Sequence, residues 1–95
     1  MSDTITKISE LLKEVAETHH RVYRITNGTD DDWASWYADW LARLSELPDL
    51  LASRPVRSEL TYHLVALDRE YSSMSPPPDL PWERYYARRL SEAFA

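Results

Sequence analysis

The sequence predicts a small all-α protein, a four-helix bundle in which residues 1–95 form a single domain. Three observations predict this class. Glycine occurs only once in 95 residues, at Gly28, which argues against a turn-rich β protein. Apolar residues recur at intervals of three and four in four separate segments, as on one face of an amphipathic helix. Turn-forming residues separate these segments, and short links between amphipathic helices are typical of a bundle.

The first predicted helix covers residues 4–25, and the polar residues 2–4 offer a cap for its first turn. Its apolar face consists of Ile5, Ile8, Leu12, Val15, His19 and Val22. Asn27 and Gly28 follow this face, and glycine readily adopts the left-handed backbone conformation found at helix ends. We therefore expect the chain to turn there.

The second predicted helix covers residues 31–47. Its apolar face consists of Trp33, Trp36, Tyr37, Trp40, Leu44 and Leu47, with Leu41 beside it. Thr29 or Asp30 is the expected cap, and the acids at 30–32 lie where the helix dipole favours negative charge. Pro48 disfavours helical geometry at the residue before it, so we expect it to end the helix.

A connector at residues 48–55 separates the second helix from the third. Within it, Leu50 and Leu51 are expected to form a short turn that covers the core. The third helix is predicted to cover residues 55–71, with Ser53 as its cap. Its apolar face consists of Val56, Leu60, His63, Leu64, Leu67 and Tyr71.

The fourth predicted helix covers residues 80–94 and follows a stiff, proline-rich connector at residues 72–78. Asp79 is its expected cap, and its apolar face consists of Trp82, Tyr85, Tyr86, Leu90, Ala93 and Phe94. Arg89 falls within the apolar arc, so we expect it to pair with a carboxylate. The three candidate carboxylates are those of Asp39, Asp68 and Glu70. The connector allows this helix to pack on its own chain or on another chain.

Composition and charge exclude several function classes. The chain has no cysteine, which excludes disulfides, cysteine-ligated metals and thiol nucleophiles. The net charge is −5, and the first fifty residues carry ten acids against five bases. Because no basic stripe is present, we expect no nucleic-acid partner. No signal peptide or long apolar run is visible, so we expect a cytoplasmic protein without a membrane partner, and no motif calls for a cofactor.

Histidines supply the first candidate for chemistry. His19 falls near the middle of the first apolar face, His63 at the edge of the third, and His20 beside the first. Histidine binds metals and titrates near neutrality, so His19, His20 and His63 form a possible metal site or supply a general base. The interpretation that we favour is that of core histidines that hydrogen-bond to their neighbours.

Aromatic residues supply the second candidate, because four large rings lie within two turns of the second helix. Core filling, a pocket for an apolar or cationic ligand, and a surface for a partner all fit this pattern. A bundle of this size has room to bury two or three such rings. The predicted ligand or partner surface consists of Trp33, Trp36, Tyr37, Trp40, Trp82 and Tyr86.

These observations favour an interaction or structural module that binds a protein partner or forms a homo-oligomer, of which a dimer is the simplest. The alternative is a bundle that binds a small molecule or a metal through His19, His63 and the aromatic residues. The chain has no phosphate-binding glycine loop, no Gly-x-Ser-x-Gly and no His-Glu-x-x-His motif. A non-catalytic function is therefore favoured, with catalysis left open.

Overall fold

The computed structural model describes residues 2–75 and 78–95 and is an all-α bundle with no strand in these two ranges. Its four long helices are α1 (Ser2–Val22), α2 (Trp33–Arg43), α4 (Arg57–Ser72) and α5 (Trp82–Ala93). Two short elements join them, the 3-10 helix η1 (Arg24–Thr26) and α3 (Leu47–Leu50). The four long helices predicted from apolar periodicity are therefore present, while residues 76–77 of the proline-rich connector lie outside the described residues.

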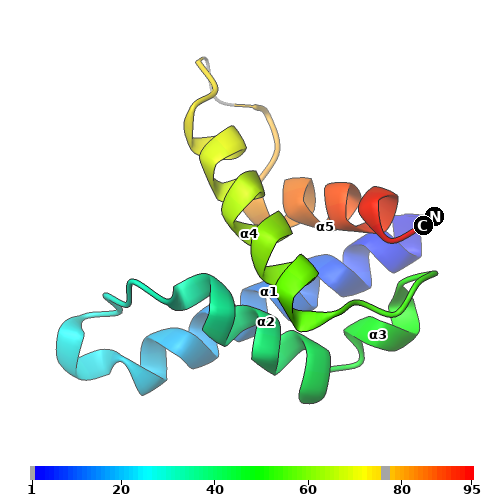
Figure 1. The fold of residues 1–95 in the computed structure, drawn as a ribbon. Coiled ribbons are helices and arrows are strands. Elements are labelled where there is room, and N and C mark those ends of the chain that lie inside the picture. The colour runs from blue at the N-terminus through cyan, green and yellow to red at the C-terminus, as the bar shows by residue number, and fades with distance from the viewer. Residues whose placement is uncertain (1, 76–77) are drawn as a thin grey trace.

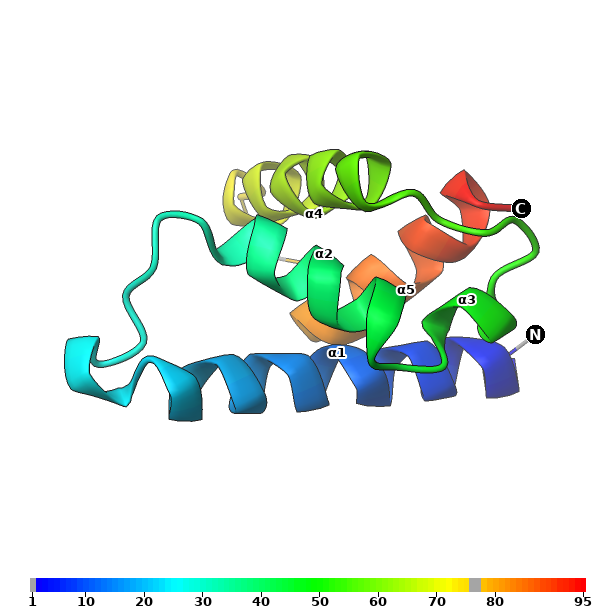
Figure 2. The same cartoon turned by 60° about the horizontal axis from the view of Figure 1, so that its bottom comes forward.

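The four long helices form three layers (Figure 1 and Figure 2). Figure 2 shows α1 along one side of the molecule and α4 along the opposite side, with α2 and α5 between them. In agreement with this order, α1 packs against α2, α3 and α5, whereas α4 packs against α2 and α5. The fourth long helix thus packs on its own chain. None of the helices in the described residues has both the length and the apolarity required for crossing a membrane.

The centre of the bundle is aliphatic, and the tryptophans surround it. The largest fully buried side chains are Ile8, Leu12, Leu41, Leu47, Leu60, Leu64, Leu90 and Val15. Each of the four tryptophans is only partly buried against this core. Burial of the aliphatic side chains removes apolar area from water and supplies the main driving force for folding. The core therefore closes without enclosing any tryptophan completely.

The second helix ends earlier than the sequence predicts, at Arg43 instead of residue 47. The Ser45 hydroxyl donates to the carbonyl of Leu41 at 2.7 Å and accepts the N–H of Leu47 at 3.1 Å, which turns the chain. Pro48 then lies in the first turn of α3, where its missing N–H is tolerated, instead of ending α2. Leu44, which the sequence places on the apolar face, is consequently exposed.

The first helix also ends earlier than predicted, at Val22, and η1 completes the segment. The expected turn follows, with positive φ angles of 58° at Asn27 and 88° at Gly28. Val22 is 59% exposed and Ile25 is 97% exposed, although the sequence predicts an inward Val22. The reason is visible in Figure 2, where the end of α1 extends beyond α2 and α4.

Helices α2, α4 and α5 begin after residues other than the predicted caps, which were Thr29 or Asp30, Ser53 and Asp79. The residues that precede α2, α4 and α5 make no side-chain cap bond; they are Asp32, Val56 and Pro81. Ser53 instead donates its backbone N–H to Phe94 O at 2.7 Å and its hydroxyl to Ala95 O at 3.1 Å. These bonds tie the connector before α4 to the end of α5. Val56 and Ala93, both predicted on apolar faces, are exposed.

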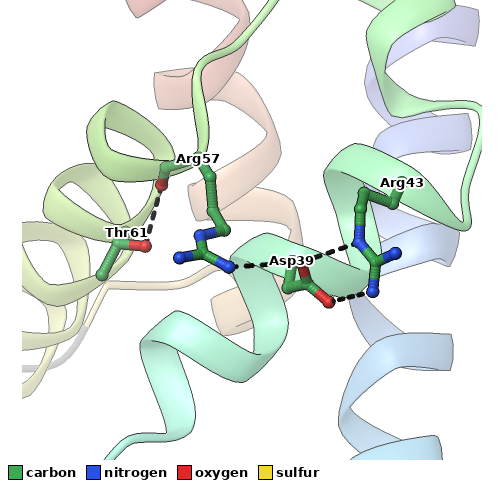
Figure 3. A network of polar contacts seen from close by, with 4 residues as sticks. All are labelled: Asp39, Arg43, Arg57 and Thr61. Atoms are coloured by element: carbon green, nitrogen blue, oxygen red, sulfur yellow. Dashed lines mark hydrogen bonds and ion pairs between the residues drawn. The ribbon is translucent and has the colours of Figure 1, made fainter.

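An exposed ion-pair network joins α2 to α4 (Figure 3). The Asp39 carboxylate accepts two bonds from Arg43, at 2.8 and 2.7 Å, and a longer one of 3.5 Å from Arg57 on α4. The Arg43 guanidinium holds the pKa of Asp39 below its usual range. This network links the two helices that also supply most of the residues of the pocket described next.

Candidate binding pocket

A pocket of about 370 Å³ is lined by two residues from each of α2, α4 and α5. The residues are Trp33, Tyr37, Asp68, Tyr71, Trp82 and Tyr86. Five of them are aromatic, one is acidic and none is basic. Its volume falls at the lower end of the roughly 300–1,000 Å³ that small-molecule sites occupy. We call this group of residues the aromatic pocket.

Helical spacing brings these side chains together. Trp33 and Tyr37 lie four residues apart on α2, so both project from the same face, and their rings meet edge to face with centroids 5.1 Å apart. Trp82 and Tyr86 repeat this arrangement on α5 at the same 5.1 Å. The third helix, α4, supplies Asp68 and Tyr71 to the same pocket. Two matching Trp–Tyr pairs thus line a pocket together with α4.

Hydrogen bonds hold the α4 side of the pocket. The Tyr71 hydroxyl donates to the Leu80 carbonyl at 2.6 Å, which ties the end of α4 to the segment that leads into α5. The Tyr86 hydroxyl donates to Asp68 Oδ1 at 3.5 Å, the long limit for such a bond. The rings of Tyr71 and Tyr86 also meet edge to face at 6.4 Å. The α4 side of the pocket is therefore held by contacts within the chain.

The charge of the pocket comes from Asp68. Burial raises the pKa of Tyr86 far above its usual value, and the neighbouring Asp68 carboxylate adds to this effect. Burial also raises the pKa of Tyr37. Both phenols therefore remain neutral at physiological pH, and Asp68 is the one acidic residue among those that line the pocket.

Four of the six aromatic residues predicted as a ligand or partner surface line this pocket, and they are Trp33, Tyr37, Trp82 and Tyr86. The other two do not: Trp36 contacts His19, and Trp40 packs against the core. Asp68 and Tyr71 complete the pocket, and the sequence reasoning did not assign them to it. Tyr71 was already placed on an apolar face, which was a usable signal, whereas Asp68 lies off that face and had none.

A second aromatic cluster surrounds His19 and is closed. The imidazole is 4% exposed, stacks on Tyr23 at 4.7 Å and meets Trp36 and Tyr37 edge to face at 5.1 and 5.3 Å. Its Nε2 lies 2.9 Å from Asp30 Oδ2, and this contact holds the pKa of Asp30 below its usual range. We call this group the histidine cluster. His19 in it is a buried, hydrogen-bonded core residue.

The Asp30 carboxylate in the histidine cluster also organises the loop before α2. Its Oδ1 accepts the backbone N–H of Asp32 at 3.0 Å. Side chains of aspartate commonly bond to the backbone two residues ahead in such turns. One carboxylate therefore connects the buried histidine of α1 to the start of α2. Asp30, which the sequence predicts as a possible helix cap, thus also belongs to the histidine cluster.

The three histidines have different surroundings. His63 is half-buried, with its ring edge to face with Tyr62 and Phe94 at 5.3 and 5.4 Å. His20 is exposed and lies beside Gly28 at the far end of α1. Within residues 2–75 and 78–95, no three or more His, Asp or Glu side chains are grouped so that they could hold a metal ion. The structure thus does not bring the predicted histidine set together.

A second hollow of about 410 Å³ lies between α4 and α5 and includes His63, Glu70 and Arg89. Arg89 pairs with Glu70, one of its three predicted partners, and also lies 3.5 Å from Glu92. The Tyr85 hydroxyl donates to Glu70 as well, and this bond raises the pKa of Tyr85. Arg89 is exposed and does not point into the core. Charges in this hollow are therefore already paired with one another.

Comparison with known proteins assigns this chain to no family. It matches no family model, no curated protein and no solved structure. What the aromatic pocket can bind follows from its own geometry and chemistry.

Proposed function

We propose that this chain is a protein-interaction module whose aromatic pocket receives a side chain of a partner protein. The supporting observation is that three helices place five aromatic rings around one pocket, while the aliphatic core is complete without a buried tryptophan. Tryptophan and tyrosine are enriched among the residues that dominate binding at protein interfaces. Large rings held in place at low entropic cost are well suited to this role.

Charge favours a basic partner over a second copy of the chain. The chain carries a net charge of −5, so two copies repel each other at long range. The pocket contains an acidic residue and no basic one. Electrostatic complementarity accelerates the association of oppositely charged surfaces and disfavours like-charged ones. The partner segment that enters the pocket is therefore proposed to be basic.

The test compares the wild type with a pocket variant and a control variant. Trp82→Ala removes a pocket wall, whereas Tyr62→Ala removes an exposed ring from the hollow on α4. We expect one protein to co-purify in stoichiometric amount with the wild type and with Tyr62→Ala, and not with Trp82→Ala. Calorimetry on the purified partner should then show an affinity about 30-fold lower for Trp82→Ala, the loss typical of a hot-spot residue. Circular dichroism verifies that both variants are folded.

Two results would contradict the proposal. If the wild type and Trp82→Ala retain the same proteins with equal affinity, the aromatic pocket is not a docking site. If the purified wild type sediments as a dimer and Trp82→Ala as a monomer, the pocket is occupied by a second copy and the charge argument for a different partner is wrong.

A further inference from the structure

We propose that the aromatic pocket selects an alkylated ammonium group, presented as a trimethylated lysine side chain of the partner. This proposal rests on the proposed function and names the group that the pocket recognises. The observation behind it is a set of five aromatic rings with one carboxylate and no basic residue.

Ring faces provide the first step. An aromatic face carries a negative potential and attracts a cation placed within about 6 Å of the ring centroid, and tryptophan does so most strongly. The pocket brings two tryptophans and three tyrosines together, and Asp68 adds a full negative charge beside them. An anionic group would be repelled by this lining. A cation with an apolar surface is attracted both by the rings and by the carboxylate.

Hydrogen-bond acceptors provide the second step, because the side-chain acceptors of the pocket are limited to the Asp68 carboxylate and the tyrosine hydroxyls. Indole nitrogens only donate. The hydroxyls of Tyr71 and Tyr86 donate to Leu80 O and Asp68, so they can only accept from a ligand, and Asp68 already accepts from Tyr86. A lysine ammonium has three N–H donors and a guanidinium has five. Donors that leave water without finding acceptors weaken binding. A trimethylammonium group has no N–H, so it retains its charge without this loss.

The histidine cluster provides the third step, because it is an occupied version of the same arrangement. There the imidazole of His19 lies among three aromatic rings, and its Nε2 contacts the carboxylate of Asp30 at 2.9 Å. Tyr37 belongs to both groups. Among residues 2–75 and 78–95, the Asp68 carboxylate in the aromatic pocket accepts only a long bond, from the Tyr86 hydroxyl at 3.5 Å. This fold thus surrounds the His19 imidazole with aromatic rings and a carboxylate. It places a similar set of rings and a carboxylate around the aromatic pocket.

The walls of the aromatic pocket are fixed before binding, which favours a small, rigid ligand group. The two edge-to-face pairs, Trp33 with Tyr37 and Trp82 with Tyr86, each lie on one helix. Tyr71 is held by its bond to Leu80. Preformed sites lose little conformational entropy on binding. The compact trimethylammonium head fits within such a site without requiring the rings to move.

The experiment is a titration followed by ¹H–¹⁵N correlation spectra, which resolve the four indole N–H signals. The probes are Nα-acetyl-Nε-trimethyllysine methylamide, its neutral carbon isostere with a tert-butyl end, the unmethylated lysine compound and choline. We expect the trimethyllysine compound to shift the indoles of Trp33 and Trp82 and to leave that of Trp40 unchanged. It should bind about tenfold more tightly than the neutral isostere, the gain expected for a cation among aromatic faces.

Matched variants separate charge from shape. Asp68→Asn keeps the size of the side chain and removes its charge, so it should weaken the trimethyllysine compound several-fold and leave the neutral isostere unaffected. Glu92→Gln, which removes a carboxylate from the other hollow, should change neither affinity. Equal changes for the charged and neutral probes in Asp68→Asn would contradict a role for the carboxylate in cation recognition.

The remaining outcomes distinguish this proposal from the proposed function. Equal affinity for the trimethyllysine compound and its isostere would overturn cation recognition, while partner capture that depends on Trp82 would still support protein docking. If choline shifts the indole signals and the trimethyllysine compound does not, the pocket binds a free cation. That result would overturn the proposal that the cation belongs to a protein side chain. Cation binding together with partner capture that is insensitive to Trp82→Ala would support recognition of the group and contradict the interaction module.

Discussion

Two aromatic groups in this protein have similar chemistry and different structural states. In the histidine cluster, three rings and Asp30 surround His19, and the imidazole is almost completely buried. In the aromatic pocket, five rings and Asp68 surround a space of about 370 Å³. The two groups share Tyr37. The comparison indicates that rings and a carboxylate enclose a side chain of the protein itself in one place, and leave an open pocket in the other.

The closed histidine cluster and the open aromatic pocket should respond differently to substitution, the first in stability and the second in binding. Residues of the histidine cluster connect α1 to the loop before α2, so their removal should affect folding. Residues of the aromatic pocket other than Tyr86 lie outside the buried core, so their removal should affect binding more than folding. Four substitutions and one pH series test the stability of these groups and of the turn between α1 and α2, beginning with the largest expected effect.

His19→Ala should lower the free energy of unfolding by about 2–3 kcal/mol, because it leaves a cavity and removes the partner of Asp30. Urea unfolding followed by circular dichroism measures this change. His63→Ala is the control, since His63 is only half-buried and should cost less. A loss below about 1 kcal/mol for His19→Ala, or an equal loss for His63→Ala, would mean that the histidine cluster does not hold the fold together.

Acid should weaken the histidine cluster through Asp30. The pKa of Asp30 is lowered in the folded state, chiefly by its hydrogen bond to His19, so the unfolded chain takes up a proton first as the pH falls. The stability that this carboxylate contributes is complete above the unfolded value of about 3.9 and is lost as the pH decreases below it. Urea midpoints measured from about pH 7 to about pH 2.5 should therefore decrease below about pH 4.

Asp30→Asn separates the contribution of this carboxylate from the others. The amide oxygen still accepts the N–H of Asp32, so the loop should keep its turn. The decrease below about pH 4 should be shallower in the variant than in the wild type. It should not disappear, because the pKa of Asp39 is also lowered, by Arg43. Identical acid profiles would show that the His19–Asp30 contact contributes nothing to stability.

Gly28→Ala should lower the free energy of unfolding by about 1 kcal/mol, because Gly28 has a φ of 88°, which L side chains rarely adopt. An added Cβ would also lie 2.7 Å from Nδ1 of His20, which is an exposed side chain that can move away. Asn27→Gly is the matched change and should be neutral or stabilising, since Asn27 has a φ of 58°. Thermal unfolding of both variants measures the difference, and a neutral Gly28→Ala would contradict a strained turn.

Apolar periodicity predicted all four long helices because their buried positions repeat every three or four residues, as Ile8, Leu12 and Val15 do on α1. Apolar periodicity did not predict the residues at which the helices end, because short-range hydrogen bonds determine those positions. At Ser45 one hydroxyl bonds to both Leu41 and Leu47 and ends α2, whereas the apolar pattern continues to Leu47. Leu47 is indeed buried, but from α3.

The aromatic pocket was only partly predictable, because its parts come from three helices. Periodicity placed Trp33 and Tyr37 on one face of α2, and Trp82 and Tyr86 on one face of α5. The packing of α4 against both helices, which brings Asp68 into the pocket, depends on how the helices cross and not on the pattern of any one of them. Asp68 lies off the apolar face and so carried no signal of its own.

Asp68→Asn should change the free energy of unfolding by less than about 0.5 kcal/mol, the smallest effect in the comparison. Asp68 is exposed, its bond to Tyr86 is long, and an amide oxygen can accept the same hydroxyl. Urea unfolding of Asp68→Asn and of His19→Ala under the same conditions compares the two losses in the free energy of unfolding. A loss above about 1 kcal/mol would make this carboxylate a structural partner of Tyr86, as Asp30 is of His19. A small loss would mean that the fold does not require the charge in the aromatic pocket, which leaves that charge available to a ligand.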